Sequence, residues 1–301
     1  MSLPQKVRRA RFGLWLGIAA RGAAMGIAEV IPGVSGGTIA FLTGIYERLL
    51  KALAAWSTDS PRILLRDGFA AFHRTHDLSF VAVLALGMIA GLVIFARLLG
   101  YFLDTHGPVV WGFIFGLIAA ALASVSRRTQ PRFLATFGAA GAVAAVFLAT
   151  LGPTGSDPTY PRFLLGGALA ASAWILPGIS GSLVLLLLGL WEPLLAALNA
   201  FQFDIIGVTV VGMAVGLALF VKLLTRLLER YRAAVFALLT GLMAGSLVRL
   251  WPWRVDDAMA LPASFRSATG DDPMVAWVLV AACLGAATIT LLARSVRESD
   301  L

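Results

Sequence analysis

Charged residues and cysteine are both scarce in this sequence. Asp, Glu, Lys and Arg together make up 13% of its 301 residues, whereas 59% are hydrophobic. Soluble domains carry about 25% charged residues, so this composition excludes an ordinary water-soluble fold. The one cysteine, Cys283, lies within an apolar run, and we therefore expect neither a disulfide nor a thiolate metal site.

What the sequence has instead is a series of long apolar runs. Each contains 16 to 29 residues without a charge or a histidine. About 20 apolar residues of helix are needed to cross the hydrocarbon core of a bilayer. The runs are Leu78–Ala96, Gly107–Ser126, Phe133–Ser156, Phe163–Trp191, Ile205–Val221, Ala233–Val248 and Pro273–Ala293. They predict an all-α polytopic membrane protein with a single membrane domain.

Two segments of the chain resemble each other. "AEVIPGVSGGTIAFLTGIYERLLKAL" at 28–53 aligns with "AWILPGISGSLVLLLLGLWEPLLAAL" at 173–198, with 12 of 26 positions identical at an offset of 145 residues. A second pair, 87–99 and 212–224, aligns at an offset of 125. Shared leucines and alanines can arise from composition alone, but a shared Pro-Gly-x-Ser-Gly core cannot. We therefore interpret the chain as an internal duplication.

Each repeat is predicted to contain a re-entrant helical hairpin and three transmembrane helices. The Pro-Gly-x-Ser-Gly core breaks each hairpin, because proline lacks an N–H donor and glycine weakens a helix. The arm at 163–176 forms about 21 Å of helix, less than the bilayer core, whereas the first arm of repeat 1 is longer and could span fully. Repeat 1 is 12–151, with a hairpin at 12–50 and helices at 78–101, 107–126 and 133–151; repeat 2 is 162–294, with a hairpin at 162–198 and helices at 205–224, 233–250 and 274–293.

The basic residues orient this arrangement. With a cytoplasmic N-terminus, 18 of the 24 Lys and Arg residues fall on the cytoplasmic side, and four (Arg162, Arg249, Arg254 and Arg266) fall outside. This positive-inside pattern accounts for the net charge of +8 without nucleic acid as a partner.

The first residues resemble a signal peptide, but Arg21 interrupts the apolar stretch, so we expect this N-terminal segment to be retained. Both termini are predicted to be cytoplasmic, and three crossings between the hairpins make the repeats inverted, as in transporters.

The two broken hairpins are candidate binding elements. Irregular backbone at membrane depth is tolerated where protein buries it or water reaches it. Free N–H groups after each turn favour an anion, glycine lets it approach, and hydroxyl groups add donors. The alternative is tight helix packing through small residues. The predicted phosphate-binding residues of the turns are Ser35, Gly36, Gly37 and Thr38 in repeat 1, and Ser180, Gly181 and Ser182 in repeat 2.

Arg21, Glu29, Arg97 and Lys222 are the candidate functional charges of the predicted membrane segments, where charge is costly and usually functional. Arg21 and Glu29 belong to the first hairpin, and their spacing turns a helix through about 800°, so both are expected to line one pathway. Arg21 is predicted to bind the anion and Glu29 to couple or gate transport. Repeat 2 has Trp174 in place of Glu29, which makes the site asymmetric. Arg97 and Lys222 occupy matching positions in the two repeats. Their side chains either take part in gating or extend to the membrane interface, and the sequence leaves both roles open.

No metal or cofactor is predicted. His73, His76 and Asp77 have a spacing that resembles a metal site, but they lie in a basic loop without a fourth ligand. Glu47 and Glu192 end the second hairpin arms. We expect them to pair with neighbouring arginines at the membrane interface.

The stretch "RGAAMGIAEVIPGVSGGTIAFLTGIYERLL" at 21–50 resembles the signature of the polyprenyl-phosphate transporter family, formerly a domain of unknown function. The second "PGISGS" and the chain length are similar too, so the resemblance covers nearly the whole chain. It implies a flippase that returns undecaprenyl phosphate from the outer to the inner leaflet of the bacterial cytoplasmic membrane, where the lipid carrier serves peptidoglycan and other envelope polymers. The implied partners are a polyprenyl-phosphate lipid and the bilayer, while Glu29 suggests protons or another coupling ion as a further partner.

Two other functions are compatible with these residues. Membrane undecaprenyl-pyrophosphate phosphatases also use inverted, re-entrant hairpins, with a motif similar to Pro-Gly-x-Ser-Arg-Ser. Here Gly36 and Gly181 stand at the arginine position, and the sequence has no Glu-x-x-x-Glu pair. Both differences favour a protein that binds a phosphate group over an enzyme that hydrolyses it. A transporter of a small soluble anion is the other alternative, because the turns would recognise only the anion.

Overall fold

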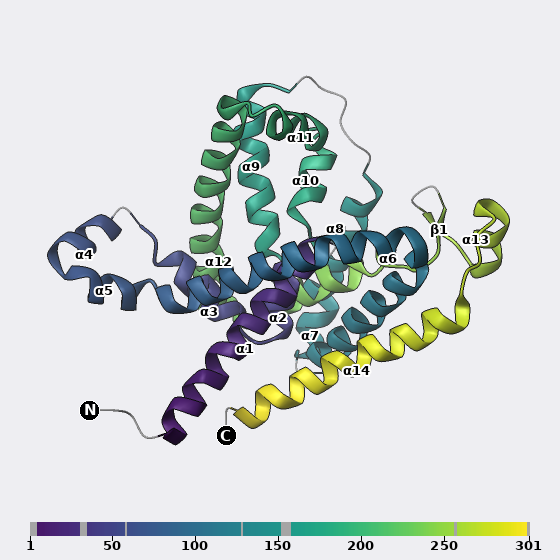
Figure 1. Ribbon diagram of the computed structural model, residues 1–301, viewed down its shortest axis with the longest axis horizontal. Coiled ribbons are helices and arrows are strands. Elements are labelled where there is room, and N and C mark those ends of the chain that lie inside the picture. The colour runs from purple at the N-terminus through teal and green to yellow at the C-terminus, as the bar shows by residue number, and fades with distance from the viewer. Residues whose placement is uncertain are drawn as a thin grey trace.

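The computed structural model describes residues 5–30, 35–57, 59–127, 129–151, 158–255 and 258–299, and these residues are overwhelmingly helical (Figure 1). Pro32 and Gly33 of the first turn lie outside the described residues. The elements in chain order are α1 (Gln5–Val30), α2 (Gly36–Leu42), α3 (Tyr46–Ala54), α4 (Ser60–Arg66), α5 (Gly68–Thr75), α6 (Leu78–Ser126), α7 (Pro131–Phe133), the π-helix η1 (Leu134–Gly138), α8 (Ala139–Thr150), α9 (Tyr160–Ile175), α10 (Gly181–Leu187), α11 (Trp191–Asn199), α12 (Phe203–Ser246), β1 (Arg254–Val255), β2 (Ala258–Met259), α13 (Pro262–Thr269) and α14 (Val275–Ser299).

Several of these helices are long and apolar enough to cross a membrane. Four qualify by length and composition among the described residues: Leu78–Phe95, Thr105–Ser126, Pro131–Thr150 and Phe203–Ser246. Large apolar side chains such as Leu86, Val93, Phe147 and Leu219 are more than 60% exposed, which is unfavourable in water and expected against lipid. The chain is therefore an all-α, multi-pass membrane protein, apart from the two-residue strands β1 and β2.

The two longest helices are each bent at one residue. The 49 residues of α6 and the 44 residues of α12 would measure about 74 Å and about 66 Å if straight, too long for one crossing. Non-helical dihedral angles occur at His106 (φ −139°, ψ 37°) in α6 and at Tyr231 (φ −130°, ψ 38°) in α12. These two residues are 125 positions apart, which is the offset of the second sequence match. Each bend falls in the gap between two helices that the sequence predicted.

Glycines bring the helices close together at matching places in the two halves. A Cβ added at Gly22 of α1 would lie 2.2 Å from the carbonyl oxygen of Leu84 in α6. One added at Gly167 of α9 would lie 2.4 Å from that of Thr209 in α12. Gly22 and Gly167 are 145 residues apart in the sequence, and Leu84 and Thr209 are 125 residues apart. These are the offsets of the two sequence matches. The α1–α6 contact therefore recurs as the α9–α12 contact.

A second close contact recurs in the same way. A Cβ at Gly116 of α6 would lie 2.0 Å from the carbonyl oxygen of Ala282 in α14, and one at Gly241 of α12 would lie 1.9 Å from that of Gly138. Gly116 and Gly241 are again 125 residues apart. Only a residue without a side chain permits helix backbones to approach this closely in a membrane.

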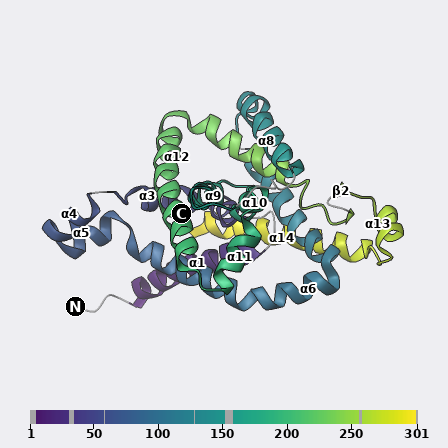
Figure 2. The same ribbon diagram turned by 90° about the horizontal axis from the view of Figure 1, so that it is seen from above.

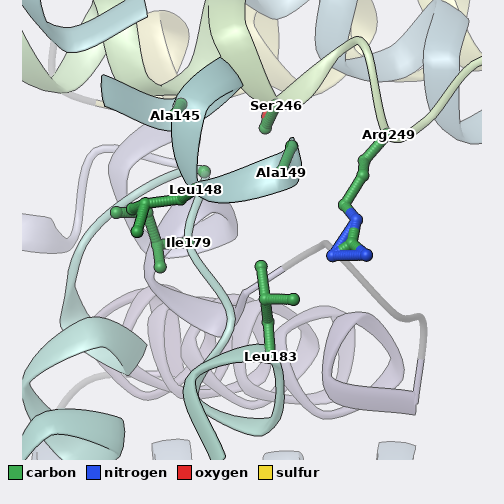
Figure 3. Close-up of a pocket in the computed structure, with 8 residues that line it drawn as sticks. Ala145, Leu148, Ala149, Ile179, Leu183, Ser246 and Arg249 are labelled. Carbon is green, nitrogen blue, oxygen red and sulfur yellow. The ribbon is translucent and has the colours of Figure 1, made fainter. Parts of the chain in front are cut away.

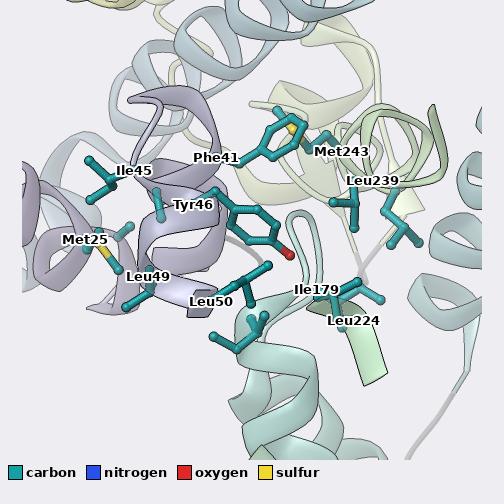
Figure 4. Packing of buried hydrophobic residues seen from close by; sticks show 14 of the residues in the cluster. Met25, Phe41, Ile45, Tyr46, Leu49, Leu50, Ile179, Leu224, Leu239 and Met243 are labelled. Carbon is teal, nitrogen blue, oxygen red and sulfur yellow. The ribbon is translucent and has the colours of Figure 1, made fainter. Parts of the chain in front are cut away.

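The main apolar core lies between the first hairpin and the second part of α12 (Figure 4). Met25 of α1, Phe41 of α2 and Tyr46 of α3 belong to one buried cluster with Leu239 and Met243 of α12. The ring centroids of Phe41 and Tyr46 are 5.5 Å apart in an edge-to-face arrangement. This cluster fixes the first hairpin against the opposite half of the chain.

Two small features lie at the ends of the molecule and were not predicted from the sequence. Helices α4 and α5 protrude at one end in both views, while β1, β2 and α13 lie at the other (Figures 1 and 2). The side chains of Trp253 and Phe265 pack together with Val278 of α14, so the short strands and α13 are attached to the helical body. A third unpredicted feature, η1, is a π-helical segment within the helix expected at 133–151.

Candidate functional site

The two hairpin turns meet in the interior of the protein. The side-chain hydroxyl of Ser35 donates to the carbonyl oxygen of Leu176 at 3.2 Å, and the backbone N–H of Gly178 donates to the hydroxyl oxygen of Thr38 at 3.0 Å. Ser35 is fully buried and Thr38 is 2% exposed. Residues about 140 positions apart thus bond the turns directly to each other.

Local chemistry explains how the first turn holds this shape. Ser35 has extended backbone angles (φ −118°, ψ 149°), and its hydroxyl oxygen accepts from the N–H of Thr38 at 3.3 Å, so it is the N-cap of α2. The N–H of Thr38 also donates to the carbonyl oxygen of Ser35 at 2.9 Å. The backbone donor at Thr38 is therefore already used within the turn.

Gly37 lets the first turn lie against the end of α9. A Cβ at this position would be 2.6 Å from the carbonyl oxygens of both Trp174 and Ile175. Tight packing through small residues, one of the two alternatives raised by the sequence, accordingly occurs at Gly37. It does not account for the polar contacts of the neighbouring residues.

The Glu29 carboxylate accepts a hydrogen bond from the backbone amide that the sequence predicted to be free for an anion. Its Oε1 atom accepts from the backbone N–H of Gly36 at 2.5 Å and from the indole Nε1–H of Trp174 at 2.6 Å. Trp174 is the residue that replaces Glu29 in the second repeat. A carboxylate seven residues upstream folds back onto the first amide of α2, so the turn binds an anion that belongs to the chain itself.

The second turn is arranged differently. The hydroxyls of Ser180 and Ser182 lie 2.7 Å apart, and Gly181 lies beside α9, where a Cβ would meet the carbonyl oxygen of Ala170 at 2.7 Å. Ser180 is buried, whereas Gly181 and Ser182 are half-buried. No carboxylate among the described residues bonds to this turn, so the two turns are not equivalent.

The remaining predicted residues are not gathered at the turns. Arg21 is half-buried in α1, and its guanidinium reaches back to within 3.5 Å of the place where a Cβ of Gly17 would lie, away from Glu29. It has no hydrogen-bond or ion-pair partner among the described residues. Lys222 is half-buried within α12. Arg97 belongs to α6, but its side chain is outside the described part of the structure.

The loop histidines have structural partners. The ring nitrogens of His76 lie 2.9 Å from the Ser60 hydroxyl and 2.8 Å from the carbonyl oxygen of Phe72, which ties α4 to α5. No cluster of three His, Cys, Asp or Glu residues that could hold a metal is found in the described ranges. Glu47 pairs with Arg232 of α12, with nitrogen and oxygen atoms 2.5 Å apart, which confirms the pairing expected for this residue.

Two further residues near the turns were missed by the sequence reasoning. Arg249 lines a hollow together with Gly178 and Ile179 of the second turn (Figure 3). The Tyr46 hydroxyl is buried without a hydrogen-bond partner among the described residues and points toward Ile179 and Leu224 (Figure 4). Arg249 was counted only as a charge on the outer side, near the end of the helix predicted at 233–250, although its position just after an apolar run could have drawn attention to it.

The chain is similar to proteins that are named polyprenyl-phosphate transporter. One, from Vibrio cholerae serotype O1, is 39% identical over 236 residues, covering 78% of this chain and 77% of the relative. Another, from Staphylococcus aureus, is 26% identical over 258 residues, covering 79% of this chain and 86% of the relative. No solved structure matches the chain.

One family model covers most of the chain and both turns. It matches residues 25–265 and is described as undecaprenyl phosphate translocase-like. The family description and the names of the relatives denote a transporter and not an enzyme. With its apolar spanning helices and its paired turns, the chain belongs to the undecaprenyl phosphate translocase-like family.

Proposed function

We propose that this protein is a flippase that moves undecaprenyl phosphate, or a related polyprenyl phosphate, from the outer to the inner leaflet of the bacterial cytoplasmic membrane. The names of the relatives support the substrate class. The observation that carries the proposal is the bond between the Gly36 amide and the Glu29 carboxylate at the junction of the two turns. A backbone amide that binds a carboxylate can bind a phosphate oxygen by the same charge-assisted hydrogen bond.

Glu29 gives the proposed cycle its switch. In the resting state its carboxylate occupies the Gly36 amide, and the incoming phosphate has to displace it. Protonation of Glu29 removes its charge and weakens this hold, which would couple phosphate binding to protons. The hydroxyls of Ser35, Thr38, Ser180 and Ser182, with the backbone of Gly37 and Gly181, then surround the head group, while the prenyl tail remains in lipid. This coupling is tested by the dependence of the leaflet-exchange rate on pH.

The more distant basic residues have supporting roles in this proposal. Arg21 lies two helical turns before Glu29 on α1 and would receive the phosphate on its way to the cytoplasmic side. Lys222 and Arg97 occupy matching positions in the two halves and would attract or release the head group near opposite faces. The lack of an ion-pair partner for Arg21 among the described residues fits a cation kept available for a transient ligand.

The proposed transport rests on two inverted repeats with both termini in the cytoplasm. The recurrent glycine contacts and the two bends at His106 and Tyr231 support the duplication. The excess of basic residues on the predicted cytoplasmic side supports the orientation. Two related but unequal halves allow the central site to face one side of the membrane and then the other.

The deciding experiment is leaflet exchange in liposomes. Purified protein is reconstituted with a fluorescent polyprenyl phosphate, and the fraction of label accessible to an impermeant quencher is followed with time. We expect faster exchange than in protein-free liposomes, no effect on a fluorescent phosphatidylcholine, and no phosphate release from polyprenyl pyrophosphate. Exchange at the protein-free rate would refute the proposal, and inorganic phosphate uptake without lipid exchange would favour a small-anion transporter.

A further inference from the structure

Two buried hydroxyl groups make no hydrogen bond within the part of the chain that the structure describes. They belong to Tyr46, the first residue of α3, and to Thr225 in α12. Burying a hydroxyl without a partner costs free energy, so most buried polar groups of a folded protein are bonded. Neither hydroxyl takes part in the contacts between the two turns, and those contacts therefore do not explain them.

The Tyr46 side chain makes an apolar contact that phenylalanine would make equally well. Tyr46 is 2% exposed, and its ring packs edge-to-face on Phe41 with the ring centroids 5.5 Å apart. Its hydroxyl points beyond this contact, toward Ile179 of the second turn and Leu224 of α12 (Figure 4). The ring thus supplies the packing, and the hydroxyl adds a donor that the packing does not use.

Thr225 differs in its bonding from other threonines of α12. The hydroxyls of Thr209 and Thr240 donate to the carbonyl oxygens four residues earlier, at 2.8 Å and 2.6 Å. This bond is a common one for a threonine within a helix. The Thr225 hydroxyl makes neither this bond nor another to the described residues, so it is available as a donor.

The two hydroxyls lie on helices that pack against each other. Tyr46 belongs to one buried cluster with Val221 and Leu228 of α12. Thr225 is four residues after Val221 and three before Leu228, which is the spacing of neighbours on one helix face. Lys222 is half-buried one helical turn before Thr225 and has no ion-pair partner in the described ranges. Two hydroxyl donors thus lie on packed helices with a lysine close to one of them.

These groups suit an anionic head group better than a trapped water. A buried water needs several polar partners, whereas the side chains that the Tyr46 hydroxyl faces, Ile179 and Leu224, are apolar. A hydrogen bond to a charged phosphate oxygen is about twice as strong as one between neutral groups. A phosphate monoester has several acceptor oxygens for the hydroxyls and a charge that Lys222 can balance. Its hydrocarbon chain can stay in the surrounding lipid.

We propose that Tyr46 and Thr225, with Lys222 beside them, form a second binding site for the head group of a lipid phosphate monoester, which opens when the second turn moves away from α3. The place of this site in transport rests on the proposed function. Tyr46 directly precedes Glu47, which the predicted topology places at the cytoplasmic interface. The phosphate therefore meets these hydroxyls after Gly36 and before it enters the inner leaflet.

The first test compares Tyr46→Phe with Tyr101→Phe in the full-length protein in nanodiscs. Binding of farnesyl phosphate and of farnesol is measured by isothermal titration calorimetry. Tyr46→Phe removes a donor to the phosphate, so we expect farnesyl phosphate to bind about tenfold more weakly and farnesol to bind as before. Tyr101→Phe removes an exposed hydroxyl from α6 and is expected to bind both like the wild type.

The unfolding temperature separates a binding role from a structural one. Because the Tyr46 hydroxyl has no partner among the described residues, its removal is expected to leave the unfolding temperature in detergent unchanged or to raise it. A lower unfolding temperature would show that the hydroxyl is bonded in the folded protein, for example to a buried water, and would overturn the site. An equal loss of farnesol binding would also overturn it, because the hydroxyl would then not act on the phosphate.

A second pair of variants tests the other hydroxyl in the same way. Thr225→Val is expected to weaken farnesyl phosphate binding without loss of stability. Thr288→Val, on an exposed position of α14 where the hydroxyl bonds to the carbonyl oxygen of Leu284 at 2.8 Å, is expected to leave binding intact. Unchanged farnesyl phosphate binding in either Tyr46→Phe or Thr225→Val would overturn the site. Inorganic phosphate that binds as tightly as farnesyl phosphate would overturn the lipid assignment.

The leaflet-exchange assay separates this inference from the proposed function. If the wild type exchanges polyprenyl phosphate and Tyr46→Phe does so at the same rate with the same affinity, the second site is wrong and the flippase stands. If the wild type shows no exchange but its farnesyl phosphate binding depends on Tyr46, the flippase is wrong and the second site stands.

Discussion

The carboxylate of Glu29 is hydrogen-bonded to the indole of Trp174, the residue at the matching position of the other repeat. The distance from Nε1 to Oε1 is 2.6 Å, and the same oxygen accepts from the Gly36 amide at 2.5 Å. Two positions that correspond by sequence are therefore in direct contact in space. Because one is an acid and the other a donor, the junction of the halves is polar and asymmetric.

This contact makes Glu29→Gln the most informative single substitution. Glutamine keeps an oxygen for the Gly36 amide but cannot carry or release a proton, so we expect lipid-phosphate binding to persist while leaflet exchange falls at least about tenfold. Any dependence of the wild-type rate on pH should also disappear. Exchange is measured in liposomes over a range of pH. Glu192→Gln, at an exposed position of α11, is the matched control, and equal rates in both variants would remove Glu29 from the mechanism.

The bond from Gly178 to Thr38 should contribute to stability as well as to transport. Thr38→Val keeps the shape of the side chain but leaves the N–H of half-buried Gly178 without its acceptor, which costs about 1–2 kcal/mol. We expect a lower unfolding temperature in detergent and slower leaflet exchange. Thr38→Ser restores the oxygen and should recover both. If Thr38→Val unfolds and transports like the wild type, the two turns do not act through this bond.

Gly37→Ala tests the close approach of the first turn to α9. The added methyl carbon would lie 2.6 Å from two carbonyl oxygens, so the hairpins must separate, at a cost of about 1–3 kcal/mol. We expect lower thermal stability and a loss of exchange. Gly207→Ala in α12 adds the same methyl group where no atom lies within 4 Å, and it should behave like the wild type. Equal effects of the two substitutions would show that the loss comes from helix propensity or general damage instead.

Much of the architecture could be predicted because lipid imposes simple rules on a sequence. Apolar runs of bilayer length gave the helical, multi-pass fold, and the bends at His106 and Tyr231 fall between predicted helices. The π-helical segment after Pro131 has no comparable signal. A π-helical turn contains one residue more than an α-helical turn, and the positions of the apolar residues do not reveal this insertion.

The residues of the turns could be named, but their bonding could not. The alignment identified Glu29 and Trp174 as a mismatch, and their contact depends on how the two hairpins face each other. The sequence also implied a free amide at Gly36, because it gives no indication that the Glu29 side chain returns to it. Arg249 was assigned to the outer end of a helix predicted at 233–250; α12 instead ends at Ser246, and Arg249 in the turn that follows lines the hollow beside the second turn.

The path of the second hairpin decides whether the repeats are inverted, and a labelling experiment can establish it. Helices α10 and α11 are bent by 106° at their junction, a geometry compatible with a broken span or with a re-entrant loop. In the predicted topology, bent α6 and bent α12 each contribute two crossings between α5 and α13, and α7 to α8 contribute one. A re-entrant α9–α11 adds none and gives five crossings, whereas a full span gives six.

An odd number of crossings places α5 and α13 on opposite sides of the membrane. In a Cys283→Ser background, we expect Ser267→Cys in α13 to react with a membrane-impermeant maleimide in intact cells, and Ala70→Cys in α5 to react only after permeabilisation. Both positions are exposed, so burial does not limit the reaction. Labelling of both from the same side would mean that the second hairpin spans the bilayer; the halves would then have parallel topology, and the two-gate exchange around Glu29 would lose its structural basis.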